Sequence, residues 1–154
     1  MASGFLYLPD GRCFARNWAM FDRVLVAVAN QLGPEPAAQR LKEWLLERIP
    51  GEDDVPEIGY GAWLRESDNV LFVRSLDLRR MAPKYHPLLC EAAKRAARAG
   101  DEDEPLRASL AFLADLVERY ERGEPPLSKS SLVDVTPPEE GNIGPEHPER
   151  PLEG

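Results

Sequence analysis

Strand-like and helical patterns alternate along this chain in the order strand, strand, helix, helix, and the order occurs twice. In the first unit, residues 5–8 and 12–16 are β-prone and flank a Pro-Asp-Gly turn, which predicts a β-hairpin. Asn17 then has the residue type of a helix N-cap. Apolar residues recur at helical spacing through residues 18–32 and again through 36–49, and pairs of Gly and Pro end both runs.

The second unit repeats this order. Residues 60–65 and 70–78 form the arms of another expected hairpin, and helices are expected over residues 88–99 and 105–123. Two hairpins can pair into one sheet, with helices layered against it. We therefore predict an α+β fold in which two β-hairpins form an antiparallel sheet of about four strands, packed against about four helices in the order β-β-α-α-β-β-α-α.

The composition changes near the end of the last expected helix. Residues 124–154 contain seven prolines, seven acidic residues and no aromatic residue. Such a segment has little apolar surface to offset the entropy cost of ordering. We expect residues 1–123 to form a single α+β domain and residues 124–154 to form an acidic, Pro-rich tail, extended or partly disordered. Its few aliphatic residues, such as Ile143, allow it to lie along the domain as an extended strap.

Negative charge is concentrated toward the C-terminus. Residues 1–50 carry six Lys/Arg and five Asp/Glu, residues 51–100 carry eight of each, and residues 101–154 carry five and fourteen. The resulting net charge of −8 repels nucleic acid and anionic membranes and favours a protein partner with a basic surface. Neither a membrane-spanning run nor a signal-peptide pattern is present in the sequence. We therefore expect a cytoplasmic protein that binds neither nucleic acid nor membrane.

Residue patterns for catalysis or cofactor binding are sparse. The sequence lacks a Gly-x-Ser-x-Gly motif, a Walker loop, a dinucleotide fingerprint and EF-hand spacing. Cys13 and Cys90 match no ligand spacing, and we expect two buried thiols in a reducing compartment; a disulfide between them is the alternative. No cofactor, metal site or enzymatic activity is expected.

His86 is the histidine within the expected domain, since His147 belongs to the tail. It follows Tyr85 at the entrance of a predicted helix, close in sequence to three basic residues, namely Arg79, Arg80 and Lys84. Backbone N–H groups at a helix start can bind an anion, and histidine serves general acid–base catalysis. A surface histidine beside a helix start explains the same pattern, and we favour that interpretation.

These properties fit a non-enzymatic protein-binding protein. The specific hypothesis is a small acidic inhibitor, such as the immunity protein that neutralises a bacterial toxin. Acidic clusters accelerate association with a basic surface, and an apolar patch on an uncovered sheet face adds contact area. The predicted partner-binding residues are Glu52, Asp53, Asp54, Glu57, Tyr60, Trp63, Leu71 and Val73.

An adaptor, chaperone or structural component of a larger assembly has the same composition. In that alternative the Pro-rich tail presents short extended motifs to its partner. The two hypotheses differ in the part of the chain that binding requires. A neutralising protein depends on the acidic residues at 52–57, an adaptor depends on the tail, and an enzyme would depend on His86.

Overall fold

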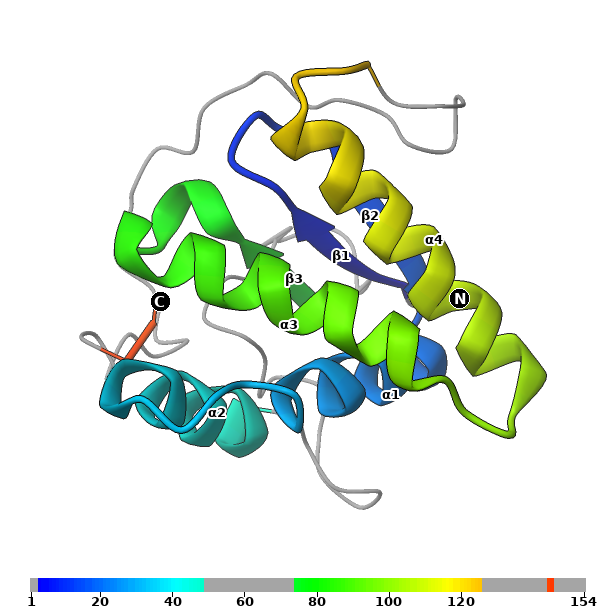
Figure 1. Ribbon diagram of the computed structural model, residues 1–154, viewed down its shortest axis with the longest axis horizontal. Coiled ribbons are helices and arrows are strands. Elements are labelled where there is room, and N and C mark those ends of the chain that lie inside the picture. Colours follow the sequence, from blue (N-terminus) through cyan, green and yellow to red (C-terminus); the bar gives the residue numbers. More distant parts are fainter. Residues whose placement is uncertain (1–2, 49–73, 126–143, 146–154) are drawn as a thin grey trace, which may run out of the picture.

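The described part of the chain comprises a small sheet and several helices. The computed structural model describes residues 3–48, 74–125 and 144–145. Figure 1 shows α3 and α4 side by side in front of the sheet, with α1 and α2 below them in this view, so the fold is broadly α+β. In chain order the elements are β1 (Ser3–Tyr7), β2 (Cys13–Asn17), α1 (Trp18–Ala29), α2 (Pro36–Arg48), β3 (Arg74–Asp77), the short 3₁₀ helices η1 (Leu78–Arg80) and η2 (Pro83–Tyr85), α3 (His86–Ala99) and α4 (Glu104–Glu121).

The first hairpin forms as the sequence predicts. β1 and β2 pair antiparallel along their full lengths. Gly11 has a φ of 95°, which favours a residue without a Cβ, and its N–H donates to the Leu8 carbonyl at 2.8 Å to close the turn. Asn17 ends β2 and also caps α1, because its side-chain oxygen accepts the Met20 N–H at 3.0 Å.

The sheet differs from the prediction. Among the described residues it has three strands in the order β2-β1-β3, and it is mixed, because β3 pairs parallel to β1 with Leu76 opposite Leu6. The expected four-stranded antiparallel sheet and its β-β-α-α-β-β-α-α order are therefore wrong. Alternating apolar residues determine which face of a strand is buried, but not the direction of its neighbour. Parallel pairing needs a long crossover, and α1 and α2 lie in the connection between β1 and β3.

Only part of the second expected hairpin lies among the described residues. Its first arm, residues 60–65, lies outside the described residues. Its second arm, expected over residues 70–78, contains β3 at Arg74–Asp77. This described part, β3, pairs parallel with β1.

The four predicted helices are present, and their boundaries lie within three residues of the predicted ones. Gly100 (φ 75°) follows α3, and Gly123 (φ 74°) lies just beyond α4, where a left-handed backbone ends a helix. Asp103 caps α4 by accepting the Leu106 N–H at 3.0 Å. Each of these helix caps and stops depends on residues only a few positions apart, so the sequence pattern is sufficient to locate the helix ends.

One face of the sheet is buried against α1, α3 and α4. Leu6 on β1 and Leu76 on β3 are paired residues of this inner face, and both are buried. α2 lies farther out and packs on α1 and η2. The helical residues that meet the inner leucines are Leu25 and Val28 of α1, Leu89 and Ala93 of α3, and Leu113 and Val117 of α4.

Arg16 joins β2 to α4. Its guanidinium lies 4.7 Å from the centroid of the Phe14 ring and 4.9 Å from that of Phe112. Its Nε donates to the Ser109 hydroxyl at 3.0 Å. Partial burial lowers the pKa of Arg16 from its ordinary value, yet guanidinium groups remain charged in proteins. The charge therefore contributes cation–π contacts, each worth about 0.5–2 kcal/mol, between strand and helix.

β1 and α1 approach closely at Gly4. Gly4 is buried, and a Cβ built on it would overlap the ring of Phe21 on α1. Phe21 is itself fully buried in the core, so its ring has little room to move. The absence of a side chain at position 4 thus allows α1 to pack directly on the strand.

We expect Gly4→Ala to destabilise the protein by about 1–3 kcal/mol, because the added methyl group forces the Phe21 ring out of its place. Gly33→Ala is the matched control. A Cβ there meets only the flexible carboxylate end of Glu35, so we expect a change within about 0.5 kcal/mol. Urea unfolding followed by circular dichroism measures both. Equal stability of the two variants would contradict the close approach at Gly4.

Candidate functional site

The residues predicted to bind a partner lie between α2 and β3. All eight of them, Glu52, Asp53, Asp54, Glu57, Tyr60, Trp63, Leu71 and Val73, fall within residues 49–73, outside the described residues. Their role therefore stays a prediction.

The described part of the outer sheet face carries aromatic and charged side chains. The rings of Phe5 and Tyr7 on β1 stack with centroids 6.3 Å apart. Asp77 pairs with Tyr7 across the sheet and bonds the guanidinium of Arg79 at 2.8 Å, while Arg79 also lies 5.1 Å from the Tyr7 ring centroid. The Asp77 side chain is only 8% exposed. This face thus carries an aromatic pair and a largely buried ion pair.

The segment between β3 and α3 holds a group of basic side chains near a helix start. We call residues 78–86 the basic turn, because Arg79, Arg80, Lys84 and His86 lie within it. Asp77 caps η1 by accepting the Arg79 N–H at 3.0 Å. The sequence had singled out these basic residues as a possible anion site, and the structure places them in one short double turn.

Two side-chain contacts, one within the basic turn and one with α2, stabilise its conformation. Nε2 of His86 lies 3.1 Å from the Met81 carbonyl, which can only accept, so this nitrogen carries the proton and donates it. Tyr85 is fully buried, and its hydroxyl accepts from Nη2 of Arg40 on α2 at 3.3 Å. The His86 ring therefore closes the turn through one of its two nitrogens, which argues for a structural role. The Tyr85–Arg40 contact was missed by sequence analysis, because nothing in either segment indicates the other.

A residue of the C-terminal segment lies on the basic turn. Gly144 is buried with a φ of 112°, and a Cβ built on it would lie 3.3 Å from Cγ of Met81. Met81 is only 3% exposed. This contact joins two residues that are 63 positions apart, and the sequence carried no signal for it.

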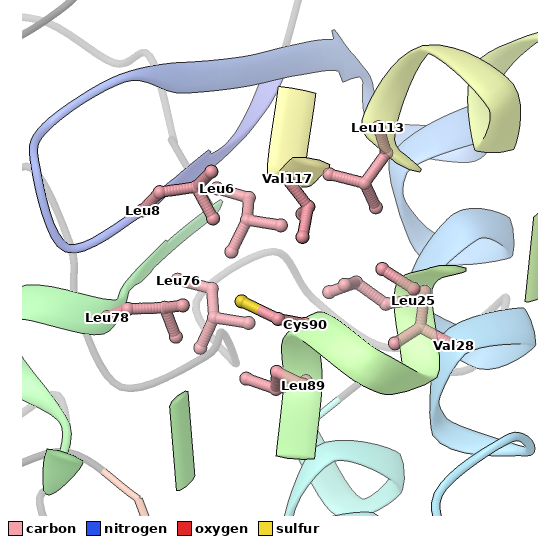
Figure 2. A pocket seen from close by; sticks show the side chains of 11 residues that line it. Leu6, Leu8, Leu25, Val28, Leu76, Leu78, Leu89, Cys90, Leu113 and Val117 are labelled. Carbon is pink, nitrogen blue, oxygen red and sulfur yellow. The ribbon is translucent and has the colours of Figure 1, made fainter. Parts of the chain in front are cut away.

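An apolar cavity lies at the centre of the core (Figure 2). It measures about 10 Å³, the space of one water-sized sphere, and lies between the inner leucines of the sheet and helices α1, α3 and α4. The Cys90 side chain points into it from α3 as the only sulfur among the labelled residues. Because the other lining residues are aliphatic, the cavity offers no hydrogen-bond partners to a polar ligand.

Neither cysteine forms a disulfide and both are buried, as the sequence indicated. Burial raises the pKa of the Cys90 thiol to about 12; the negative charge of Glu121 adds to the rise, Lys94 opposes it, and Glu91 adds to it again. Nucleophilic chemistry requires the thiolate. Cys90 therefore behaves as a small apolar core residue at neutral pH.

A second polar cluster lies at the tip of the first hairpin. Arg12 is 4% exposed and bonds the Asp10 carboxylate at 2.7 Å, with its guanidinium carbon 5.8 Å from the Tyr120 ring centroid. Its Nη1 is buried without a hydrogen-bond partner. Burial is the main cause of a raised pKa at Tyr120. The cluster anchors the hairpin tip to the end of α4.

The described ranges contain neither a candidate metal site nor a candidate membrane-spanning helix. No group of three or more His, Cys, Asp or Glu side chains in these ranges is placed to hold a metal ion. None of the helices in them combines the length and apolar character that crossing a bilayer requires. We therefore take the basic turn, together with the contact between Gly144 and Met81, as the candidate site.

We expect the Cys90 thiol to resist modification in the folded protein. In a Cys13→Ala background, a disulfide reagent at pH 8 should react on the order of 10³-fold more slowly with the native chain than with the chain in guanidinium, because the unfolded thiol has a pKa near 9 and burial raises that of the folded thiol. Both rates are measured from the absorbance of the coloured thiolate that the reagent releases. Comparable rates would show that Cys90 is accessible and ionisable.

The raised pKa of Cys90 also predicts that the free energy of unfolding depends on pH. The unfolded thiol ionises near pH 9 and the folded one near pH 12, so the contribution of Cys90 is complete below pH 9 and is lost as the pH rises toward 12. Between pH 8 and 10.5 the wild type should lose about 2 kcal/mol more unfolding free energy than Cys90→Ala. Urea unfolding of both chains at each pH tests this, and parallel losses would contradict it.

Comparison with known proteins gives no relative for this chain: no protein-family model, no curated protein and no solved structure matches it. Functional inference therefore depends on the residues described above and on the sequence.

Proposed function

We propose that the chain is a non-enzymatic protein-binding protein that recognises a basic protein surface, in the manner of a toxin-neutralising immunity protein. The observation that carries this proposal is the distribution of charge. The described residues carry 16 Lys/Arg and 15 Asp/Glu, whereas the remaining residues carry three and twelve. The folded body is thus nearly neutral, and the acidic excess belongs to the rest of the chain.

The densest part of that excess is the connection between α2 and β3. Residues 49–73 contain six acidic residues and one basic residue, Arg65. A field of this sign raises the association rate with a basic partner and repels nucleic acid. Glu52, Asp53, Asp54 and Glu57 are accordingly proposed as the steering residues, and Tyr60, Trp63, Leu71 and Val73 as the residues that add contact area.

The use of the reactive side chains supports binding rather than catalysis. His86 donates to the Met81 carbonyl, and Cys90 is held as a neutral thiol in an aliphatic cavity. General acid–base and nucleophilic catalysis need a group that can reach a substrate and change its protonation state near neutral pH. In the described residues these groups maintain the fold instead.

The adaptor alternative assigns binding to the tail. The position of Gly144 against Met81 bears on it, because at least this point of the tail lies on the domain. Truncation after Gly123 separates the alternatives, since a neutralising protein keeps its partner after truncation and an adaptor loses it.

Charge reversal tests the proposal directly. The full-length chain carrying Glu52→Lys, Asp53→Lys and Asp54→Lys should lose at least about tenfold in affinity for its partner, mostly through a slower association, because the steering field changes sign. The matched control reverses three exposed acids of the described body, Glu43, Glu102 and Glu104, and so makes the same change in net charge.

The measurement is recovery of a stoichiometric partner from native lysate, followed by surface plasmon resonance with that partner at two salt concentrations. Binding that survives the reversal at 52–54, or falls equally in the control, would overturn the assignment of these residues. Binding that is lost only on truncation would favour the adaptor.

A further inference from the structure

Arg16, near the end of β2, is held in one orientation by four contacts. Its guanidinium carbon lies 4.7 Å from the ring centroid of Phe14 and 4.9 Å from that of Phe112. Nε donates to the Ser109 hydroxyl at 3.0 Å, and Nη1 donates to the Ala15 carbonyl at 2.7 Å. Because β2 and α4 both supply contacts, this long side chain loses its conformational freedom on folding rather than on binding a ligand.

One side of this guanidinium is open. The ring centroids of Phe14 and Phe112 are only 6.1 Å apart, so the two rings form a corner on one side of the group and do not enclose it. Arg16 is half-buried, and its Nη2 donates to no acceptor among the described residues but remains in contact with solvent. The two N–H groups of Nη2 are therefore free to donate to an acceptor that approaches from solvent.

The positive charge of Arg16 has no carboxylate partner within the described ranges. Burial lowers the pKa of Arg16 from its ordinary value, and no described carboxylate opposes that shift. The acidic residues of α4 that flank this region, Glu104 and Asp115, pair with arginines of their own helix at 3.8 Å and 3.1 Å. By contrast, Arg12 bonds Asp10 at 2.7 Å. A partly desolvated cation without a counter-ion favours the approach of an anion, because pairing offsets the desolvation.

The surface of α4 beside the guanidinium is apolar. Phe112 packs on the core and is half-buried rather than buried. Ala108 precedes Phe112 by one helical turn on the same side of α4 and is exposed, as is Ala111. Residues 105–114 of the helix include a single charged residue. A ligand bound at Arg16 therefore has an apolar surface to contact next to its charge.

We propose that Arg16 is the binding site for a small organic acid, whose carboxylate pairs with the guanidinium while its apolar carrier group lies along Phe112 and the exposed alanines of α4. This inference goes beyond the proposed function and does not depend on it. A carboxylate suits the site because it has the single negative charge that one guanidinium neutralises, and its two oxygens accept from a planar fork of N–H groups. A phosphate monoester carries a charge of about −1.5 to −2 at pH 7, which is more than this site balances.

Titration of the ¹⁵N-labelled full-length chain with sodium hexanoate tests the site by NMR. The Nε–H resonance of Arg16 is a direct probe, because its bond to Ser109 slows exchange with water, and Arg16→Lys assigns the resonance by removing it. We expect a saturable shift of this resonance and of the Phe112 amide, with a Kd on the order of 1–10 mM for a ligand of this size. Sodium chloride keeps the ionic strength constant, so that screening does not change during the titration.

The guanidinium is tested with Arg16→Lys, which keeps the charge but removes the planar fork. We expect the Kd read from the Phe112 amide to rise at least about tenfold. Arg23→Lys is the matched control, because Arg23 is exposed and pairs with Asp103, and its Kd should equal that of the wild type. Circular dichroism verifies folding. Ser109→Ala is the second variant if Arg16→Lys does not fold: it keeps Arg16 but removes the acceptor of Nε, so we expect a several-fold higher Kd.

Other probes test the chemistry of the ligand. Sodium acetate, sodium phosphate and a blocked glutamate residue should each bind more weakly than hexanoate. Acetate of equal affinity would overturn the apolar carrier group, and phosphate of higher affinity would overturn the carboxylate. Equal or tighter binding of the blocked glutamate would assign the site to acidic side chains of a protein instead of a small organic acid. The absence of a saturable hexanoate shift at Arg16, or an equal loss of affinity in Arg16→Lys and Arg23→Lys, would overturn the site itself.

Discussion

The central position of β1 is the constraint on which the rest of the described structure depends. β1 hydrogen-bonds to β2 on one edge and to β3 on the other, so Leu6 and Leu76 come to lie side by side on the inner face. α1 can pack on this face because Gly4 leaves room for Phe21. The parallel pairing also places the end of β3, and therefore the start of the basic turn, beside the end of β1 at Tyr7.

Polar groups inside this fold are used to join elements. Arg16 lies between the rings of Phe14 and Phe112, and Asp77 holds Arg79 over Tyr7. Burying a charge is costly unless it is paired, and each of these charges has aromatic or carboxylate partners that offset the cost. Each of these charged side chains thereby links one element of the described fold to another.

Charge is separated along the chain rather than spread over it. The described residues are nearly neutral, whereas the acidic excess lies in residues 49–73 and in the Pro-rich tail. Gly144 of the tail contacts Met81 of the basic turn. A segment with an excess of one charge favours recognition of a surface of the opposite charge.

The sequence by itself determined the local features: the first hairpin, the Asn17 cap, and the four helices with their glycine stops. These features depend on interactions between residues a few positions apart, so the sequence pattern is sufficient to predict them. It also located the basic residues around His86, but not the contact of Tyr85 with Arg40 or that of Met81 with Gly144. Only the tertiary structure decided the parallel β1–β3 pairing and the docking of Gly144 on Met81, because each joins segments more than 60 residues apart and depends on packing that no local pattern records.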